Sequence, residues 1–452
     1  MKKSLIFLLI LSLFPIISYA EELSLKNALD VAMEKSPAVV SAKQEVIAAD
    51  ARLGQAFGTL LPNLSASGKV GSGYMQPYDM AIQATLGTVE QNIAMQQGVN
   101  EIYSTSNYSV TISQPIFMMG VLPALDAARN SYEIAKQNYL KADLDLEYNV
   151  VNSYYGYLKV EKLYELAKDS LDQANSHLNQ AQAMLSAGTA TRADVLRAEV
   201  QVANMELGLL KAKNSLAIAK DAFNNTLSRD LDANVDLSEK EIANEYVTPL
   251  TFNECEAKVF DNRPDWKIFQ LNKMINKNRS DIAYSGYFPN VSLVGNYGAN
   301  NSTYQTNSFL NANYFDWTVT ANAQWMLFDG LATPSRVKEA QANLAAFDAN
   351  EQSFRNGIIL EVKDACLNLE TSVDLIKSAK KTVDLARENY RISKERYRTG
   401  AGSNLEMIDA ETAFTEAQNS LYQSQFDYQI AKAKVNQATG AEIYPFGEKE
   451  GK

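Results

Sequence analysis

The hydrophobic and polar positions follow the same order twice along this chain. Each half opens with helical spacing around a proline, Pro37 or Pro264, and 25 residues later carries a Pro-Asn pair at Pro62 or Pro289. Alternating, strand-like segments come next, followed by a long stretch of helical spacing. A repeat of roughly 210–230 residues is far longer than a solenoid unit. The pattern therefore predicts an internal duplication.

Four segments read as β-strands, at about 63–73, 108–117, 290–300 and 316–328. In the last of them Trp317 and Trp325 share the apolar face, whereas Thr318 and Thr320 lie on the other. Soluble strands also alternate, but the two tryptophans are eight residues apart, or roughly 26 Å at strand rise. We expect them to form an aromatic girdle at two membrane interfaces. The polar residues 74–107 read as a long loop.

Two proline-free stretches predict long helices at about 121–187 and 332–399, followed by returning helices at about 191–227 and 404–439. At 1.5 Å per residue each long helix would reach about 100 Å. A glycine ends each one, Gly188 and Gly400, where the chain can reverse. Such lengths are typical of coiled-coil-like packing. The predicted fold class is mainly α with membrane β.

The N-terminus has the three parts of a signal peptide. Lys2 and Lys3 precede an apolar run at 5–17, and a small-x-small site ends at Ala20. We therefore expect an exported chain without a lipid anchor, since no cysteine lies near that site. The predicted limits are a signal peptide at 1–20, a first structural repeat at 21–227, a linker region at 228–262, a second structural repeat at 263–440 and a C-terminal tail at 441–452.

The composition argues against several classes of function. The net charge of −11 argues against nucleic acid as a partner. The chain carries no Gly-rich phosphate loop and no catalytic constellation, so we expect neither an enzyme nor a cofactor or metal site. His177, the one histidine, stands in a polar helical stretch and reads as a surface residue. Cys255 and Cys366 both fall in predicted helix, and a disulfide or two separate buried thiols would each fit.

Beyond the signal peptide no segment is apolar enough for a transmembrane helix. A membrane span would then have to be a closed β-barrel, because lipid offers the backbone no hydrogen bonds. Four strands cannot close a barrel, which takes about eight. We therefore expect a homotrimer, which would supply twelve strands and a matching ring of helices.

At this point the residues resemble the TolC-like outer-membrane efflux proteins, over about 25–440. The resemblance rests on the Leu-Pro-Asn and Phe-Pro-Asn strand starts, the Gln-Pro-Ile-Phe strand exit at 114–117 and the two glycine-centred turns. It implies a trimeric twelve-stranded β-barrel in the outer membrane, continued by a long periplasmic α-helical barrel with an equatorial belt at the linker region. The implied function is the exit channel of a tripartite efflux pump or a type I secretion system. The implied partners are a periplasmic adaptor (membrane fusion) protein, an inner-membrane RND, ABC or MFS transporter, and outer-membrane lipid.

The resemblance also implies site residues. Glu406 and Asp409 lie three residues apart on one helix face, and would form a periplasmic gate as a ring of acids in the trimer. Asp194 and Tyr397 would link the two turns. The residues implied to contact the adaptor are Leu185, Gly188, Thr189, Gly400 and Ala401, and the strand–helix junctions are Pro62, Pro115 and Pro289.

One position departs from the family's pattern. Gly402 stands where an arginine is expected to help lock the gate, and Arg192 or Arg398 could take its place.

Another class of function stays open. A periplasmic or surface coiled-coil scaffold or adhesin would explain the long helices, though not the tryptophan-bearing strands. Within the channel interpretation, drug efflux, metal efflux and protein secretion are not distinguished.

Overall fold

A computed structural model describes residues 22–75, 78–86, 89–97, 101–238, 249–305 and 311–446. The predicted signal peptide lies outside these residues, as do part of the linker region and the end of the tail. The described chain is mainly helical and divides into two compact units. The first unit comprises residues 1–44, 137–267 and 353–452, and the second comprises 45–136 and 268–352.

The helices are α1 (Leu25–Lys35), α2 (Pro37–Gly58), α3 (Val121–Ser186), α4 (Arg192–Thr226), α5 (Phe252–Asn262), α6 (Pro264–Tyr284), α7 (Ala332–Arg398) and α8 (Asn404–Thr439), with a 3-10 turn, η1 (Ser285–Tyr287), after α6. Pro37 and Pro264 are the first residues of α2 and α6. Proline is favoured there because the first N–H of a helix has no intrahelical acceptor. None of the helices formed by the described residues combines the length and apolarity that a bilayer span needs.

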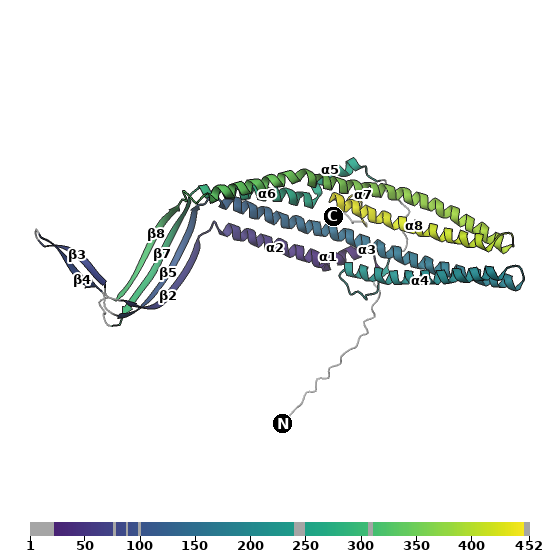
Figure 1. The fold of residues 1–452 in the computed structure, drawn as a ribbon, viewed down its shortest axis with the longest axis horizontal. Coiled ribbons are helices and arrows are strands. Elements are labelled where there is room, and N and C mark those ends of the chain that lie inside the picture. Colours follow the sequence, from purple (N-terminus) through teal and green to yellow (C-terminus); the bar gives the residue numbers. More distant parts are fainter. Residues whose placement is uncertain are drawn as a thin grey trace, which may run out of the picture. The chain divides into compact units, whose positions relative to one another are not determined.

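The strands are β1 (Glu22–Leu23), β2 (Asn63–Met75), β3 (Tyr78–Leu86), β4 (Val89–Gln97), β5 (Glu101–Phe117), β6 (Asp236–Leu237), β7 (Asn290–Tyr304) and β8 (Ala312–Gln324). Four of them form the antiparallel sheet of the second unit, in the order β2-β5-β7-β8 (Figure 1). β3 and β4 pair as a separate hairpin, and β1 pairs with β6 in the first unit.

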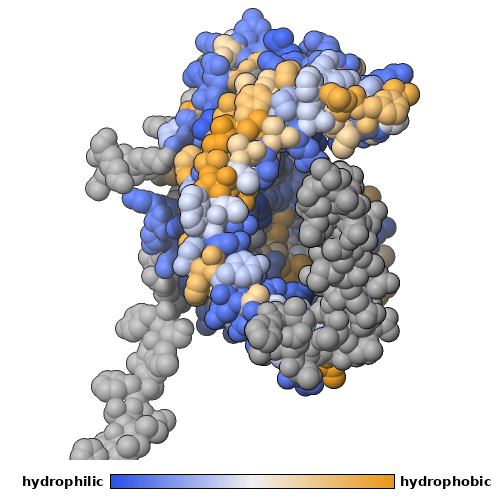
Figure 2. Space-filling model, turned by 90° about the vertical axis from the view of Figure 1, so that its left-hand side faces the viewer, coloured by the Kyte–Doolittle hydropathy of each residue, from blue (hydrophilic) through white to orange (hydrophobic). Residues whose placement is uncertain are grey.

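The register gives this sheet one apolar and one polar face. Directly opposed residues form the apolar rows Leu64–Ile112–Gly295–Val319, Ala66–Val110–Tyr297–Trp317 and Gly68–Tyr108–Ala299–Phe315. The alternate rows are polar, as in Ser65–Thr111–Asn296–Thr318. Most of the large apolar side chains stay exposed, Trp317 at 73% and Phe315 at 69%. Figure 2 shows hydrophobic residues gathered in a band beside hydrophilic ones.

Two sequence predictions about the strands are wrong. Residues 74–107 are not a loop, because β2 continues to Met75, β5 starts at Glu101, and the β3–β4 hairpin lies between them. β8 is shifted from the predicted 316–328 and ends at Gln324. Trp325 thus follows the strand, and its indole N–H donates to the Tyr287 carbonyl at 3.0 Å. Apolar periodicity continues beyond the last ladder hydrogen bond, which is why the sequence overextended this strand.

The three junction prolines stand at strand ends. Pro62 and Pro289 immediately precede β2 and β7. Pro115 lies near the end of β5, where the pairing with β7 shifts register before Phe117. A bulge tolerates proline because one ladder hydrogen bond is already missing.

The core of the first unit consists of three apolar clusters. One joins α1, α3, α4 and α8 around Tyr154 and Phe223. A second joins α5, α7 and α8 around Val259, Leu369 and Tyr428. The third is small and holds the end of α3 to the start of α4. These clusters fix the helices whose turns carry the candidate site.

Both helical turns reverse at a glycine with positive φ, +77° at Gly188 and +75° at Gly400. The N–H of Thr189 donates to the Met184 carbonyl at 2.9 Å, and that of Ala401 to the Arg396 carbonyl at 2.8 Å. These bonds satisfy carbonyls that the ending helix leaves free.

Gly400→Ala is expected to lower the thermal unfolding midpoint of the detergent-purified protein, followed by far-UV circular dichroism. A Cβ there meets nothing within 4 Å, so the cost of about 1 kcal/mol is that of the left-handed backbone alone. The matched control is Gly357→Ala, which also meets nothing within 4 Å but lies inside α7, where alanine stabilises a helix by about 0.8–1 kcal/mol. Shifts of the same sign in both variants would contradict this explanation.

Candidate functional site

The candidate site is the turn cluster, which we define as His177, Asp194, Tyr397, Asn404 and Glu411. These residues come from α3, α4, α7 and α8 of the first unit, close to the two turns. His177, Tyr397, Asn404 and Glu411 are each at most 4% exposed. Buried polar groups at the ends of four helices are uncommon, since each needs a hydrogen-bond partner.

Asn404 joins both turns. It is the first residue of α8, after the N-cap Ser403. Its Nδ2 donates to the Asp194 carbonyl at 2.9 Å, and its Oδ1 lies 2.6 Å from His177 Nε2. Because a carbonyl can only accept, the amide must present Oδ1 to the histidine, so Nε2 carries the proton. Asn404 therefore fixes the tautomer of His177.

The other ring nitrogen of His177, Nδ1, is buried without a hydrogen-bond partner among the described residues. Burial lowers the pKa of His177 and keeps the ring neutral. The prediction that His177 lies at the surface is wrong. A signal was present in the sequence, because Ala174, His177 and Ala181 are spaced by three and four residues and all face the core.

Tyr397 packs edge-on against the His177 ring, with centroids 5.2 Å apart. Burial, and then the negative charge of Asp194, raises the pKa of its hydroxyl. The structure thus brings the predicted partners Asp194 and Tyr397 near each other. The hydroxyl nevertheless has no hydrogen-bond partner among the described residues, and the observed bond between the turns is that of Asn404.

The Asp194 carboxylate caps α4. It accepts from the backbone N–H of Thr191 at 3.0 Å and from its hydroxyl at 2.6 Å, while the Asp194 N–H donates back to the hydroxyl oxygen at 3.2 Å. Such a capping box satisfies helix-end donors. The hydrogen bonds from the Thr191 side chain and backbone lower the pKa of Asp194.

The predicted acids Glu406 and Asp409 are both exposed on α8, whereas Met407 and Ala410, which follow them directly, are buried. They share a face, as their spacing requires. Glu406 is paired at 3.8 Å with Arg396, whose guanidinium also donates to the Ala401 carbonyl at 3.2 Å.

Gly402 has a steric reason to lack a side chain. A Cβ at this position would lie 2.9 Å from the Arg396 Cβ and 3.2 Å from the Tyr397 nitrogen. Neither suggested substitute for the missing arginine lies against Asp194, because Arg192 pairs with Glu199 and Arg398 with Glu395. The closest observed ion pair of Asp194 is with Arg197, at 3.8 Å.

The predicted adaptor-contacting residues divide into two groups. Leu185 packs against Ala181, Val195 and Ala198 and holds α3 to α4. Gly188, Thr189, Gly400 and Ala401 are exposed at the turns. Four of the five are therefore accessible in this chain.

Glu411 is 3% exposed and its Oε2 has no hydrogen-bond partner among the described residues. Burial raises its pKa to about 7, against the opposing charge of Lys394 on α7. Glu411 in turn adds to burial in raising the pKa of Tyr390 to about 12. Glu411 does not stand out in the sequence, since nothing in its neighbours distinguishes it from the exposed Glu406.

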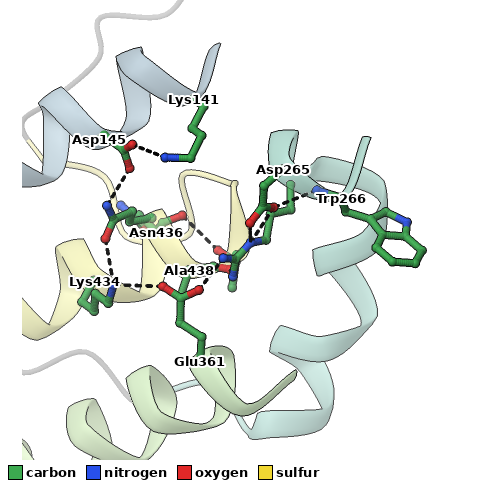
Figure 3. Close-up of polar contacts among 11 residues, drawn as sticks. Lys141, Asp145, Asp265, Trp266, Glu361, Lys434, Asn436 and Ala438 are labelled. Carbon is green, nitrogen blue, oxygen red and sulfur yellow. Dashed lines mark hydrogen bonds and ion pairs between the residues drawn. The ribbon is translucent and has the colours of Figure 1, made fainter. Parts of the chain in front are cut away.

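A second polar group in the first unit is fully paired (Figure 3). Arg263 binds Asp265 at 2.8 Å, the Ala438 carbonyl at 2.9 Å and the carboxylate of Glu361. Lys434 also binds Glu361, at 3.0 Å. Arg263, Asp265 and Glu361 line a cavity of about 280 Å³ together with Lys141 and Asp145, which pair with each other. Asp145 also accepts a hydrogen bond from the side-chain amide of Gln437 on α8 at 2.8 Å. These bonds tie α3, α6, α7 and α8 together, and each of these charged side chains has a partner of opposite charge. Among residues that the structure describes, no group of three or more His, Cys, Asp or Glu could hold a metal.

Glu411→Gln is expected to change how stability depends on pH. The folded pKa near 7 exceeds the unfolded value of 4.5, so the folded state holds an extra proton between these values. Wild-type stability therefore falls as pH rises from 4.5 to 7, by at most about 3 kcal/mol, and this contribution is flat above pH 7. The variant should match wild type near pH 4.5 and exceed it at pH 8 in thermal unfolding midpoint.

The lowered pKa of His177 makes stability rise with pH instead. Wild type and Glu411→Gln share this contribution, so the difference between their unfolding midpoints reports on Glu411 alone. The exposed Glu416→Gln, on the same helix, is the control and should run parallel to wild type. A Glu411→Gln curve that is also parallel would contradict the buried, protonated carboxyl.

Comparison with known proteins places the chain in a family. The outer membrane efflux protein family matches residues 28–227 and 258–441. TolC of Vibrio cholerae serotype O1 is 21% identical, over 73% of this chain and 76% of that protein. TolC of Escherichia coli K12 is 20% identical, over 97% and 87%. The structure of the outer-membrane channel OprN superposes with a TM-score of 0.78 at 17% identity, over 92% and 90%. The predicted resemblance is thus confirmed, and the chain belongs to the outer membrane efflux protein family as an outer-membrane protein with a large periplasmic portion.

Proposed function

We propose that this protein is the outer-membrane exit channel of a tripartite efflux pump or type I secretion system. The observation that carries the proposal is the four-stranded sheet with one apolar face and two open edges, β2 and β8. An open edge exposes unpaired backbone groups, which lipid cannot satisfy. Three chains would close twelve strands into a barrel. The apolar rows, with Trp317 and the neighbouring Trp325 as an aromatic girdle, would then face lipid.

We further propose that the two halves arose by duplication, with repeats at 21–227 and 263–440. Each half contributes two strands of the sheet and one long helix with its returning helix. In a trimer these helices would form the periplasmic helical barrel. The exposed turn residues would meet the adaptor protein, and an RND, ABC or MFS transporter would supply the energy. The channel itself would conduct passively, without catalysis.

We place the periplasmic gate at the turn cluster and the exposed acids beside it. Glu406 and Asp409 from three chains would form a ring that attracts cations, since like charges concentrate a negative potential. Asp194 and Tyr397 would help to hold the gate closed. In the single chain Asn404 donates to the Asp194 carbonyl, and His177, which is bonded to Asn404, packs against Tyr397. Adaptor binding at the turns would separate the helices and widen the ring.

A scaffold or adhesin is the competing function. It is not favoured, because an exposed apolar sheet face of this size needs a partner or lipid to cover it. Fractionation separates the two proposals: a channel remains with outer membrane and needs detergent, whereas a scaffold is released by washing.

Conductance in a planar bilayer tests the gate. The purified protein should give small, uniform, cation-preferring steps that divalent cations block. Glu406→Gln with Asp409→Asn should abolish both the preference and the block, because the ring then carries no charge. The control Glu416→Gln, two turns further along α8, should behave as wild type. Unchanged selectivity in the double variant would remove the gate assignment and leave the channel.

Asn404→Ala is expected to raise the resting conductance of the closed channel. It removes both hydrogen bonds that Asn404 makes and leaves His177 Nε2 unpaired, which costs about 1–3 kcal/mol in the closed state. The matched control is Asn419→Ala, on the same helix but outside the turn cluster. Equal resting conductance in wild type and Asn404→Ala would contradict a lock at Asn404, while raised conductance in both variants would point to general loosening of α8.

A further inference from the structure

Cys255 and Cys366 lie against each other in the first unit. Cys255 is on α5 and Cys366 on α7, 111 positions apart in the chain. Their sulfur atoms are 2.8 Å apart, and the side chains are 0% and 4% exposed. Sulfurs in contact need only a small side-chain adjustment to reach a covalent distance of about 2.05 Å.

The surroundings offer the two thiols no other chemistry. They sit in the apolar cluster that contains Val259, Val362, Leu369 and Val435. Burial, and then the neighbouring Cys255, raises the pKa of Cys366 to about 12. A thiol of this kind is neither a nucleophile nor a metal ligand in the folded chain. What the pair can do is bond to each other.

The compartment favours that bond. The protein is an outer-membrane protein with a large periplasmic portion, and the periplasm is an oxidising space in which disulfides form and persist. We propose that Cys255 and Cys366 form an intramolecular disulfide that joins α5 to α7. The proposal rests on the outer-membrane location and is independent of the gate.

The bond would form by exchange with a disulfide-bearing oxidant protein of the periplasm, before the cluster closes. One cysteine, as thiolate, attacks the oxidant's disulfide, so that a mixed disulfide forms and one oxidant thiolate leaves. The second cysteine then attacks the mixed disulfide, which forms the Cys255–Cys366 bond and releases the second oxidant thiolate. The chain loses two electrons and two protons, and the oxidant becomes a dithiol.

The location gives the bond a structural purpose. α5 is an 11-residue helix, too short to be stable alone. Its start is held by the Leu250 N–H donating to the Tyr444 hydroxyl at 2.9 Å, and its end by the Arg263 network. A disulfide would fix its middle to α7 and close a loop that contains α6, β7 and β8. Loops of this length give a cross-link a large effect on the unfolded chain.

The test counts free thiols in the full-length protein from outer membranes. Cells are quenched in acid, and the denatured chain is treated with a heavy maleimide before and after reduction. We expect no added maleimide without reductant and two after it, with an intact mass lower by two hydrogens than that of the reduced chain. Two maleimides without reductant would overturn the proposal, as would a reductant-sensitive dimer on a gel.

Two variants keep the test independent of folding defects. Cys255→Ser should take one maleimide without reductant, because Cys366 then has no partner. In Cys255→Ser/Cys366→Ser, reductant should leave the thermal midpoint unchanged, whereas it should lower that of wild type. Equal effects of reductant on both proteins would overturn the stabilising role. Bilayer conductance of the double variant reports separately on the proposed channel function. A loss of conductance would therefore not be mistaken for evidence about the disulfide.

Discussion

The open edges of the four-stranded sheet are the constraint on which the rest of the molecule depends. β2 and β8 each present a row of backbone N–H and C=O groups that no other strand of the described residues pairs with in this sheet. Leaving such groups unpaired in lipid costs several kcal/mol each. In the proposed trimer the partner strands for these two edges would come from other copies of the chain. The same proposal would bring the long helices of three chains together as the periplasmic helical barrel.

The first unit contains two clusters of polar side chains, the Arg263 network and the turn cluster, and they differ in how far their hydrogen bonds are satisfied. In the network around Arg263 each charge has a partner, so separating the helices there would break several charge-assisted hydrogen bonds at once. In the turn cluster His177 Nδ1, the Tyr397 hydroxyl and Glu411 Oε2 are buried without partners among the described residues. Separating the helices would hydrate all three and recover part of the cost. Separating the helices at the turns, where we propose the gate, would therefore cost less free energy than separating them at the Arg263 network.

The sequence predicted helix limits well because proline and glycine act locally. α3 ends at Ser186 and α8 spans Asn404–Thr439, within one residue of the expected bounds. It did not predict the β3–β4 hairpin, although Tyr78, Met80, Ile82, Ala84 and Leu86 alternate with the other residues of β3. The surrounding segment contains Pro77 and many Asn and Gln residues, which are typical of a loop and outweighed that alternation. It misplaced His177 because one polar residue on a buried stripe depends on a distant partner, here Asn404, 227 positions away. The spacing of Glu406 and Asp409 alone predicted that they share one helix face, and the structure shows that both are exposed there.

The proposed disulfide and the proposed gate lie on the same helix, and their separation has a mechanical consequence. Tyr397 is 31 residues beyond Cys366 in α7, or about 45 Å along the helix at 1.5 Å per residue. A long helix bends gently rather than breaking. With α7 fixed near Cys366 by the core cluster and by a covalent bond to α5, a tilt of only about 10° would displace its far end by roughly 8 Å over that length. A rigid attachment of α7 near Cys366, together with the buried polar atoms of the turn cluster that lack partners among the described residues, would let a small tilt of α7 widen the proposed ring.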